Sequence, residues 1–226
     1  MVAAHSGSHR NATLDMLIPA SDHPAVILAN GDYPSHNIPL ALLDRHSYLC
    51  CCDRAGMTAV RHGIMPDAIV GDGDSLSPAF QQEYAGIFHH IEEQDDNDLT
   101  KATRFMRSQG FRKIVYLGAT GLREDHTLAN VSLMAYYHQE LGIEPVMITD
   151  YGYFTVNEGC KTFESFPHQQ ISIFNINCKR LQSRGLHWPA SPFNQLWQGT
   201  LNEAESDRFV LDGDGTFMVY QTFDAK

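Results

Sequence analysis

The segment Asp67-Ala68-Ile69-Val70-Gly71-Asp72-Gly73-Asp74-Ser75 is an apolar run followed by an acidic turn that contains glycine. The apolar run predicts a buried strand, and ligands bind α/β sheets beyond the carboxyl ends of their strands. Asp72 and Asp74 repel one another unless a cation lies between them, and their oxygens suit Mg²⁺ that carries nucleotide phosphates. Taken alone, the turn is also compatible with a solvated Asp/Gly loop. Other parts of the chain must therefore decide between the two interpretations.

Strand and helix patterns alternate through the first part of the chain. Apolar runs predict strands at 25–29, 47–52, 67–70 and 113–117. Helical spacing predicts helices at 39–46, 77–84, 98–109 and 124–141, with Ser77 as an N-cap and with Gly110 and Gly142 as stops. This alternation predicts an α/β fold with a doubly wound, mainly parallel sheet up to about residue 150.

The pattern changes after Tyr151. Segments 152–156, 170–176 and 209–220 are rich in β-branched and aromatic residues and are separated by turn residues. They predict a second domain, an antiparallel β-sandwich. The segment Asp212-Gly213-Asp214-Gly215 resembles part of a Ca²⁺ loop but lacks the glutamate of its twelfth position, so a hairpin turn is predicted there. The expected organisation is a disordered lead-in at 1–20, an α/β domain at 21–150 and the β domain at 151–226.

Composition narrows the possible partners. The net charge is -11, and no basic surface is expected that could bind a nucleic-acid backbone. No nucleic-acid partner is therefore expected. No apolar run approaches the ~18 residues that span a bilayer, so no membrane partner is expected. The consecutive cysteines Cys50, Cys51 and Cys52 form neither a disulfide framework nor a spaced metal pair. We interpret them as buried thiols of a cytoplasmic protein.

Acidic residues recur where predicted strands end or helices begin: Asp53, Asp72, Asp74, Asp95, Asp96, Asp98 and Asp125. In a doubly wound sheet these positions lie along one edge, where carboxylates distant in sequence can meet. Asp98 or Asp125 could equally be a helix-start residue favoured by the macrodipole. The turn Gly118–Arg123 combines backbone N–H groups, a helix N-terminus and a guanidinium, which together favour anion binding.

Several ordered segments resemble one family. Residues 28–34 (LANGDYP) are similar to its LANGxxP segment, 66–75 (PDAIVGDGDS) to PDxxxGDxDS, 94–102 (QDDNDLTKA) to DQDxTDxxKA, and 118–130 (GATGLREDHTLAN) to GAxGGRxDHxLAN. Residues 185–189 (GLHWP) and 199–203 (GTLNE) are weaker matches. By these segments the chain resembles the thiamine pyrophosphokinases from about Val26 to its C-terminus.

The resemblance implies a fold, an activity and an assembly. It implies an α/β nucleotide-binding domain and a β-sandwich that binds thiamine, assembled as a homodimer with active sites at the interface. The implied reaction is Mg²⁺-dependent transfer of the diphosphoryl group of ATP to the hydroxyl of thiamine, giving thiamine diphosphate and AMP. The implied metal ligands are Asp72, Asp74, Asp98 and Asp125, which with Arg123 are the implied catalytic residues.

The resemblance also implies two sets of substrate contacts. For ATP they are Asn30, Gly31, Ser75, Lys101, Gly118, Arg123, His126 and Asn130. For thiamine they are Asp53, Gln94, Trp188 and Asn202.

The chain departs from the family pattern at a few positions. Arg54 and Leu122 stand where the family has glycine, Asn97 where it has threonine and Leu201 where it has serine. None of these changes removes a matching acidic residue. Two rival functions use the same residues: a Mg²⁺-dependent nucleotide phosphohydrolase with water as nucleophile, and a non-catalytic nucleotide sensor. A hydrolase has no need of Trp188, and a sensor has no need of every metal carboxylate.

Overall fold

The computed structural model describes residues 18, 19 and 21–225. These form two compact units, one of His23–Asp150 and one that contains Tyr151 onward together with the first described residues. Apart from residues 18 and 19, the predicted lead-in at 1–20 lies outside the described residues. None of the helices in the described part of the chain is long and apolar enough to cross a membrane.

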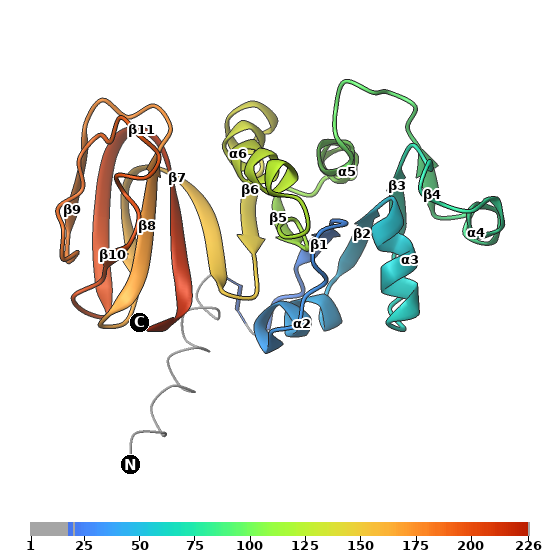
Figure 1. The fold of residues 1–226 in the computed structure, drawn as a ribbon, viewed down its shortest axis with the longest axis horizontal. Coiled ribbons are helices and arrows are strands. Elements are labelled where there is room, and N and C mark those ends of the chain that lie inside the picture. Colours follow the sequence, from blue (N-terminus) through green and yellow to red (C-terminus); the bar gives the residue numbers. More distant parts are fainter. Residues whose placement is uncertain (1–17, 20, 226) are drawn as a thin grey trace, which may run out of the picture. The chain divides into compact units, whose positions relative to one another are not determined.

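The first unit is a parallel sheet between helices (Figure 1). Its strands are β1 (Ala25–Leu28), β2 (Tyr48–Cys52), β3 (Ala68–Gly71), β4 (Phe88–His90), β5 (Lys113–Leu117) and β6 (Glu144–Ile148), in the order β6-β5-β1-β2-β3-β4. The neighbouring strands pair in parallel. The helices are α2 (Asn37–Asp44), α3 (Arg54–Arg61), α4 (Pro78–Glu83), α5 (Asp98–Ser108) and α6 (Glu124–Leu141). The predicted α/β class is confirmed.

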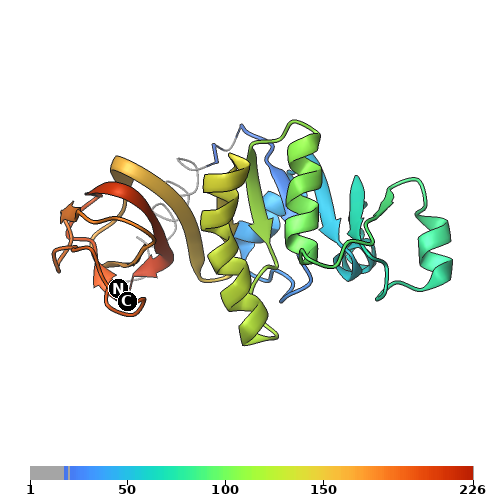
Figure 2. The same ribbon diagram turned by 90° about the horizontal axis from the view of Figure 1, so that it is seen from above.

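Burial on both faces explains the continuous apolar strands. All residues of β1 and of β3 are buried. Figure 1 shows α5 and α6 on one side of the central strands and α2 and α3 on the other, so both side-chain directions of each strand meet apolar surface. Figure 2 shows α5 and α6 running next to each other along one face. The consecutive cysteines of β2 are buried thiols, as predicted.

Local capping agrees with several predicted helix boundaries. The Ser77 hydroxyl accepts the Phe80 N–H at 3.2 Å and Pro78 begins α4. Gly142, with φ of 60°, ends α6 in the left-handed conformation that favours glycine. The sequence patterns did not identify α3, whose Gly56 packs against Ile69: a Cβ there would lie 2.7 Å from Ile69 Cδ1. The absence of a side chain at Gly56 therefore lets α3 approach Ile69 of β3 closely.

The second unit is antiparallel, as predicted. Its strands are β7 (Gly152–Glu164), β8 (Gln169–Asn175), β9 (Leu181–Arg184), β10 (Asn202–Glu203) and β11 (Arg208–Ala225). The order is β10-β8-β11-β7, and β9 also pairs with β11. Its core is a cluster of buried apolar side chains that includes Ile171, Ile173, Phe209, Leu211 and Phe217.

The hairpin turn predicted at residues 212–215 is wrong. These residues lie inside β11, and the pairing with β7 shifts register between Gly213 and Thr216. The Asp214 carboxylate accepts the backbone N–H groups of Lys179 and Arg180, each at 2.8 Å. These long-range contacts hold the extra residues as a bulge in a continuous strand, and the local Asp/Gly composition could not reveal them.

Candidate active site

A buried carboxylate begins the site at the carboxyl end of β2. Asp53 caps α3 with φ of 40° and is 6% exposed. Its N–H donates to Val70 O at 2.9 Å, and the Ser75 hydroxyl donates to its Oδ2. Its other oxygen, Oδ1, is buried and has no hydrogen-bond partner among the described residues. A buried, unsatisfied carboxylate oxygen indicates a position where a ligand can bind.

Asp72 lies at the carboxyl end of the neighbouring strand, β3. Its carboxylate accepts the Asp74 N–H at 3.1 Å and the Gln94 side-chain amide at 3.1 Å. These hydrogen bonds lower the pKa of Asp72, so it is ionised at neutral pH. The structure thus brings together Asp72 and Gln94, while the Asp74 side chain is exposed on the same turn.

Asp98 is the first residue of α5. Burial raises its pKa, and the nearby negative charges of Asp53 and, more weakly, Asp72 raise it further. Lys101, which is 3% exposed, opposes this rise with its ammonium 3.8 Å from Asp98 Oδ1. The charges of Asp53 and Asp72 therefore both act on Asp98, and we call Asp53, Asp72 and Asp98 the acidic cluster.

The turn after β5 (Gly118–Arg123) lies against the turn after β1. Gly31 N–H donates to Gly118 O at 2.7 Å, and Asp32 N–H donates to Thr120 O at 2.9 Å. We call Gly118–Arg123 the anion turn. The Gly121 N–H is committed to Thr127 Oγ1 at 3.0 Å, so it is not one of the donors available to an anion. Leu122, where the family has glycine, has φ of 59°.

Arg123 and Asp125 form a bidentate ion pair at the start of α6. The distances are 2.6 Å and 3.1 Å, and the two side chains are 67% and 62% exposed. The hydrogen bond from Arg123 lowers the pKa of Asp125. In this arrangement the Asp125 carboxylate is paired with Arg123 and is not one of the carboxylates that act on Asp98. His126 is exposed in the same first turn.

The donor set fits Mg²⁺. Among the described residues no group of three or more His, Cys, Asp or Glu side chains is arranged to hold a metal ion. Mg²⁺ commonly takes only one or two carboxylates and completes its shell with water and substrate phosphates, so a preassembled cage is not required. The unsatisfied oxygen of Asp53 and the mutual repulsion within the acidic cluster are what a bound cation would relieve.

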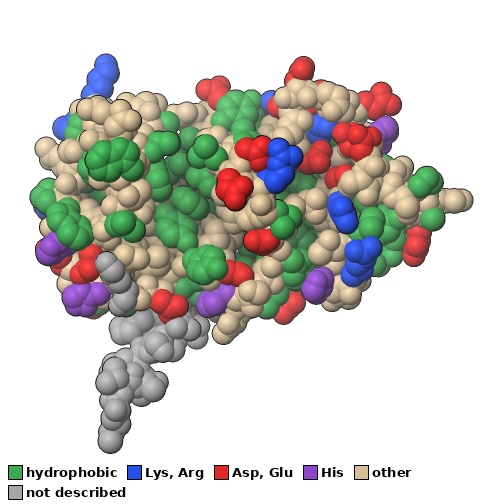
Figure 3. Space-filling model, in the orientation of Figure 1, with side chains coloured by type: hydrophobic (Ala, Val, Ile, Leu, Met, Phe, Trp, Pro, Cys, Tyr) green, Lys and Arg blue, Asp and Glu red, His purple; other side chains and the backbone are tan. Residues whose placement is uncertain are grey.

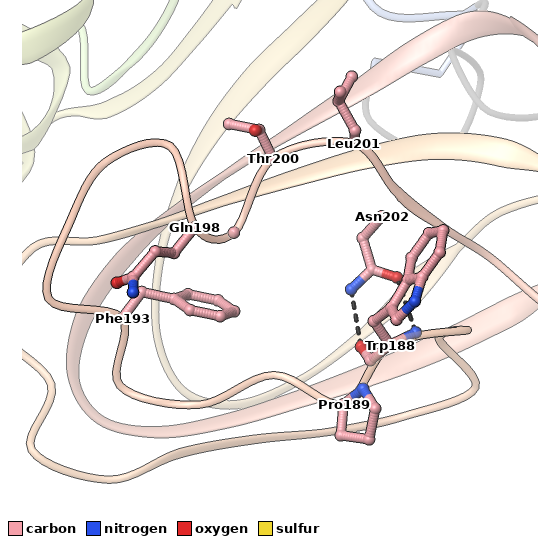
Figure 4. A pocket seen from close by; sticks show the side chains of 8 residues that line it. Trp188, Pro189, Phe193, Gln198, Thr200, Leu201 and Asn202 are labelled. Atoms are coloured by element: carbon pink, nitrogen blue, oxygen red, sulfur yellow. Dashed lines mark hydrogen bonds between the residues drawn. The ribbon is translucent and has the colours of Figure 1, made fainter.

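The second unit contains a pocket of about 320 Å³ beside Trp188. Figure 4 shows Trp188 and Asn202 on one side of it, and Phe193 and Gln198 on the other. Asn202 Oδ1 accepts the Trp188 N–H at 3.1 Å, and its Nδ2 donates to Trp188 O at 2.7 Å. The buried Asn202 amide therefore holds the Trp188 backbone, while the Trp188 side chain is 55% exposed.

Sequence reasoning identified only part of this pocket. Phe193 and Gln198 also line it, and no local pattern in the sequence marks them. Gly199 and Thr200 line it too; they belong to the matching segment 199–203 but are not among the predicted thiamine contacts. Leu201, at the position where the family has serine, has φ of 61° and a 68% exposed side chain.

The fold and these two sites define a two-domain protein with an α/β unit suited to nucleotide phosphates and a β unit with an aromatic pocket. Comparison with family models agrees: residues 40–144 match the catalytic domain of thiamin pyrophosphokinase, and residues 152–220 match its substrate-binding domain. The chain belongs to the thiamin pyrophosphokinase family.

Solved structures show the same fold. The thiamine pyrophosphokinase of Bacillus subtilis is 19% identical with a TM-score of 0.71, over 88% of this chain and 99% of that chain. The Geobacillus thermodenitrificans protein is 22% identical with a TM-score of 0.71, over 88% and 97%. The yeast enzyme is 14% identical with a TM-score of 0.70, over 92% and 89%. A comparison with curated proteins found no match.

Proposed function

We propose that this protein catalyses Mg²⁺-dependent transfer of the diphosphoryl group of ATP to the hydroxyl of thiamine, giving thiamine diphosphate and AMP. The observation that carries the proposal is the acidic cluster, with the buried ammonium of Lys101 3.8 Å from Asp98 at the start of α5. Its location in the family's catalytic domain supports the same reading.

Charge neutralisation is the main physical demand of the reaction. In the proposed site, Asp72, Asp74, Asp98 and Asp125 hold Mg²⁺, which supplies positive charge to the phosphate oxygens. Lys101 and Arg123 stabilise the charge that builds up on the equatorial oxygens of the transferred group. The remaining proposed ATP contacts are Asn30, Gly31, Ser75, Gly118, His126 and Asn130.

Asp98 is the proposed proton acceptor. A loose phosphoryl transition state needs no strong base, but the thiamine hydroxyl must lose its proton as the new bond forms. Asp98 is proposed for this role because it lies at the start of α5 within the acidic cluster.

Thiamine is the proposed occupant of the aromatic pocket. Its thiazolium is a cation, and the half-exposed indole of Trp188 offers a face for a cation–π contact. Asn202 acts by holding Trp188, and Asp53 and Gln94 are the proposed polar contacts. We further propose that the protein is a cytoplasmic homodimer with active sites at the interface, for which sedimentation velocity should show a species of twice the chain mass.

The deciding experiment is to incubate the protein with ATP, Mg²⁺ and thiamine and to resolve the products. Equal amounts of thiamine diphosphate and AMP are expected. ADP and phosphate formed regardless of thiamine would instead identify a phosphohydrolase. Nucleotide binding without turnover would identify a sensor.

The variant Asp74→Asn tests the proposed metal site. Turnover should fall by about 100-fold or more, because the change removes a metal ligand. The circular dichroism spectrum and Tm should stay unchanged, because Asp74 is exposed on a turn. Wild-type turnover in this variant would contradict the metal assignment.

A further inference from the structure

A side-chain hydrogen bond between Asn97 and Asn130 links the start of α5 to α6. Asn97 Nδ2 donates to Asn130 Oδ1 at 3.2 Å. Asn97 is the N-cap of α5 and directly precedes Asp98, a member of the acidic cluster. Asn130 lies on α6, whose start follows the anion turn. This one bond therefore joins the elements that carry the two parts of the proposed ATP site.

Backbone partners fix the orientation of both amides. The Thr100 N–H lies 2.9 Å from the Asn97 side chain and can only donate, so Oδ1 of Asn97 must face it. The Ala119 carbonyl lies 2.8 Å from the Asn130 side chain and can only accept, so Nδ2 of Asn130 must face it. These two assignments leave the Asn97 donor opposite the Asn130 acceptor.

The same chain of hydrogen bonds begins in the core. The Tyr137 hydroxyl lies 2.8 Å from Thr100 Oγ1, which donates to Asn97 Oδ1 at 2.8 Å. Tyr137 is fully buried, and burial raises its pKa, so the phenol stays protonated and donates to Thr100. Each hydroxyl or amide in this chain of hydrogen bonds therefore donates to the next, from Tyr137 at one end to the Ala119 carbonyl at the other.

Three successive carbonyl groups of the anion turn accept hydrogen bonds from two different parts of the chain. Gly118 O accepts Gly31 N–H and Thr120 O accepts Asp32 N–H, both from the turn after β1. Ala119 O, between them, accepts the Asn130 amide. Asn130 therefore anchors the middle of the turn, and through Asn97 that anchor is tied to the first residue of α5.

We infer that Asn97 and Asn130 are positioning residues that hold the anion turn at a set distance from the acidic cluster; the catalytic consequence rests on the proposed function. The Asn130 amide bonds within the protein through both its oxygen and its nitrogen, so Asn130 places Ala119 before any nucleotide binds. A threonine at position 97 could cap α5, but it has no amide nitrogen to donate to Asn130.

The first test measures amide hydrogen exchange by NMR on the full chain without substrates. Asn97→Ser keeps an oxygen to cap α5 but removes the amide, and Asn130→Ala leaves that cap untouched. In both variants the backbone amides of Gly31, Asp32 and Gly121 should exchange about tenfold faster than in the wild type. The Gly31 and Asp32 amides bond to carbonyls of the anion turn, and Gly121 lies within it. Ser108→Ala, at the other end of α5, is the matched control and should exchange as wild type.

The second test measures kcat and KM for ATP. Each variant should lower kcat/KM about tenfold, and the double variant should be no worse than the more damaging single one, since both remove the same link. Unchanged exchange at the three amides in both variants would overturn the inference and leave Asn97 as a simple cap. Additive effects in the double variant would overturn it as well. If the wild type makes no thiamine diphosphate, the proposed function fails, while hydrogen exchange still decides the role of these asparagines.

Discussion

At the scale of single residues, the ionised carboxylate of Asp98 is needed in the proposed site but lowers the stability of the native state. Its carboxylate is partly buried and faces the charge of Asp53, and both effects raise its pKa. A raised folded-state pKa means that ionisation at neutral pH destabilises the native state. Protonated Asp98 stabilises the native state at low pH. This contribution is lost as the pH rises through the folded-state pKa of Asp98.

Asp98→Asn should therefore raise Tm at pH 7.5 while lowering turnover by about 100-fold or more. The gain in Tm should shrink as the pH falls toward 4, because wild-type Asp98 then becomes protonated. Calorimetry across this pH range and a product assay give both quantities. A lower Tm at pH 7.5 would show that Asp98 stabilises the fold through its pair with Lys101.

Gly31 is required by close approach of two turns. A Cβ at this position would lie 2.3 Å from Thr120 O and 2.5 Å from Gly118 O. Gly31→Ala should lower the free energy of unfolding by about 1–3 kcal/mol, because backbone atoms must move apart. The matched control is Gly86→Ala, where a Cβ meets nothing within 4 Å and the expected change is within about 0.5 kcal/mol. Urea denaturation of both variants checks the difference.

At the scale of elements, Asp150 holds the segment that enters α2. Its carboxylate accepts the Ser35 N–H and the His36 N–H, each at 3.0 Å, and the Ser35 hydroxyl. His36 is the N-cap of α2. Partial burial opposes ionisation of Asp150, but the hydrogen bonds outweigh it and lower the pKa. The end of β6 thereby fixes the path of the chain after β1.

Asp150→Asn should lower the free energy of unfolding by about 1–2 kcal/mol at pH 7, because hydrogen bonds to a charged acceptor are replaced by weaker ones. A lowered pKa contributes stability above the unfolded-state value and loses it as the pH falls through the folded-state value. The difference from wild type should thus diminish below about pH 4. Asp44→Asn, an exposed carboxylate on α2, should behave as wild type in the same pH series.

Elements with strong local signals could be predicted from sequence, and those defined by distant partners could not. The apolar run of β5 and the capping residues of α4 predict their elements because the signal lies within the element. β11 differs, because Asp214 bonds to backbone groups of residues 179 and 180. A local reading of Asp and Gly as a turn therefore failed there.

At the scale of the whole molecule, each unit has its own apolar core. Leu28, Leu42 and Ile69 are fully buried in the first, and Ile171 and Phe217 in the second. Figure 3 shows carboxylate and basic side chains on the face drawn, among hydrophobic and uncharged surface. The apolar cores stabilise the two units, whereas the proposed metal ligands lie on turns and helix starts. The fold should therefore not depend on a metal.

Chelation by EDTA should abolish turnover yet leave Tm nearly unchanged. ATP with Mg²⁺, at about 100 times its Kd, should stabilise the protein by about 2.7 kcal/mol and raise Tm accordingly. Thermal unfolding followed with EDTA, with Mg²⁺ alone and with both ligands checks each part. A large fall in Tm on chelation would show a structural metal instead.

Local sequence was enough to predict the α/β class, the antiparallel second unit and the position of Asp72, Asp74 and Asp98 at strand ends or helix starts, because these depend on periodicity and capping within short segments. It could not predict which carboxylates act on one another, or that Asn130 bonds to Asn97 and Ala119. Those contacts join residues brought together by the packing of α5, α6 and the strands, and no pattern within a single segment encodes that geometry.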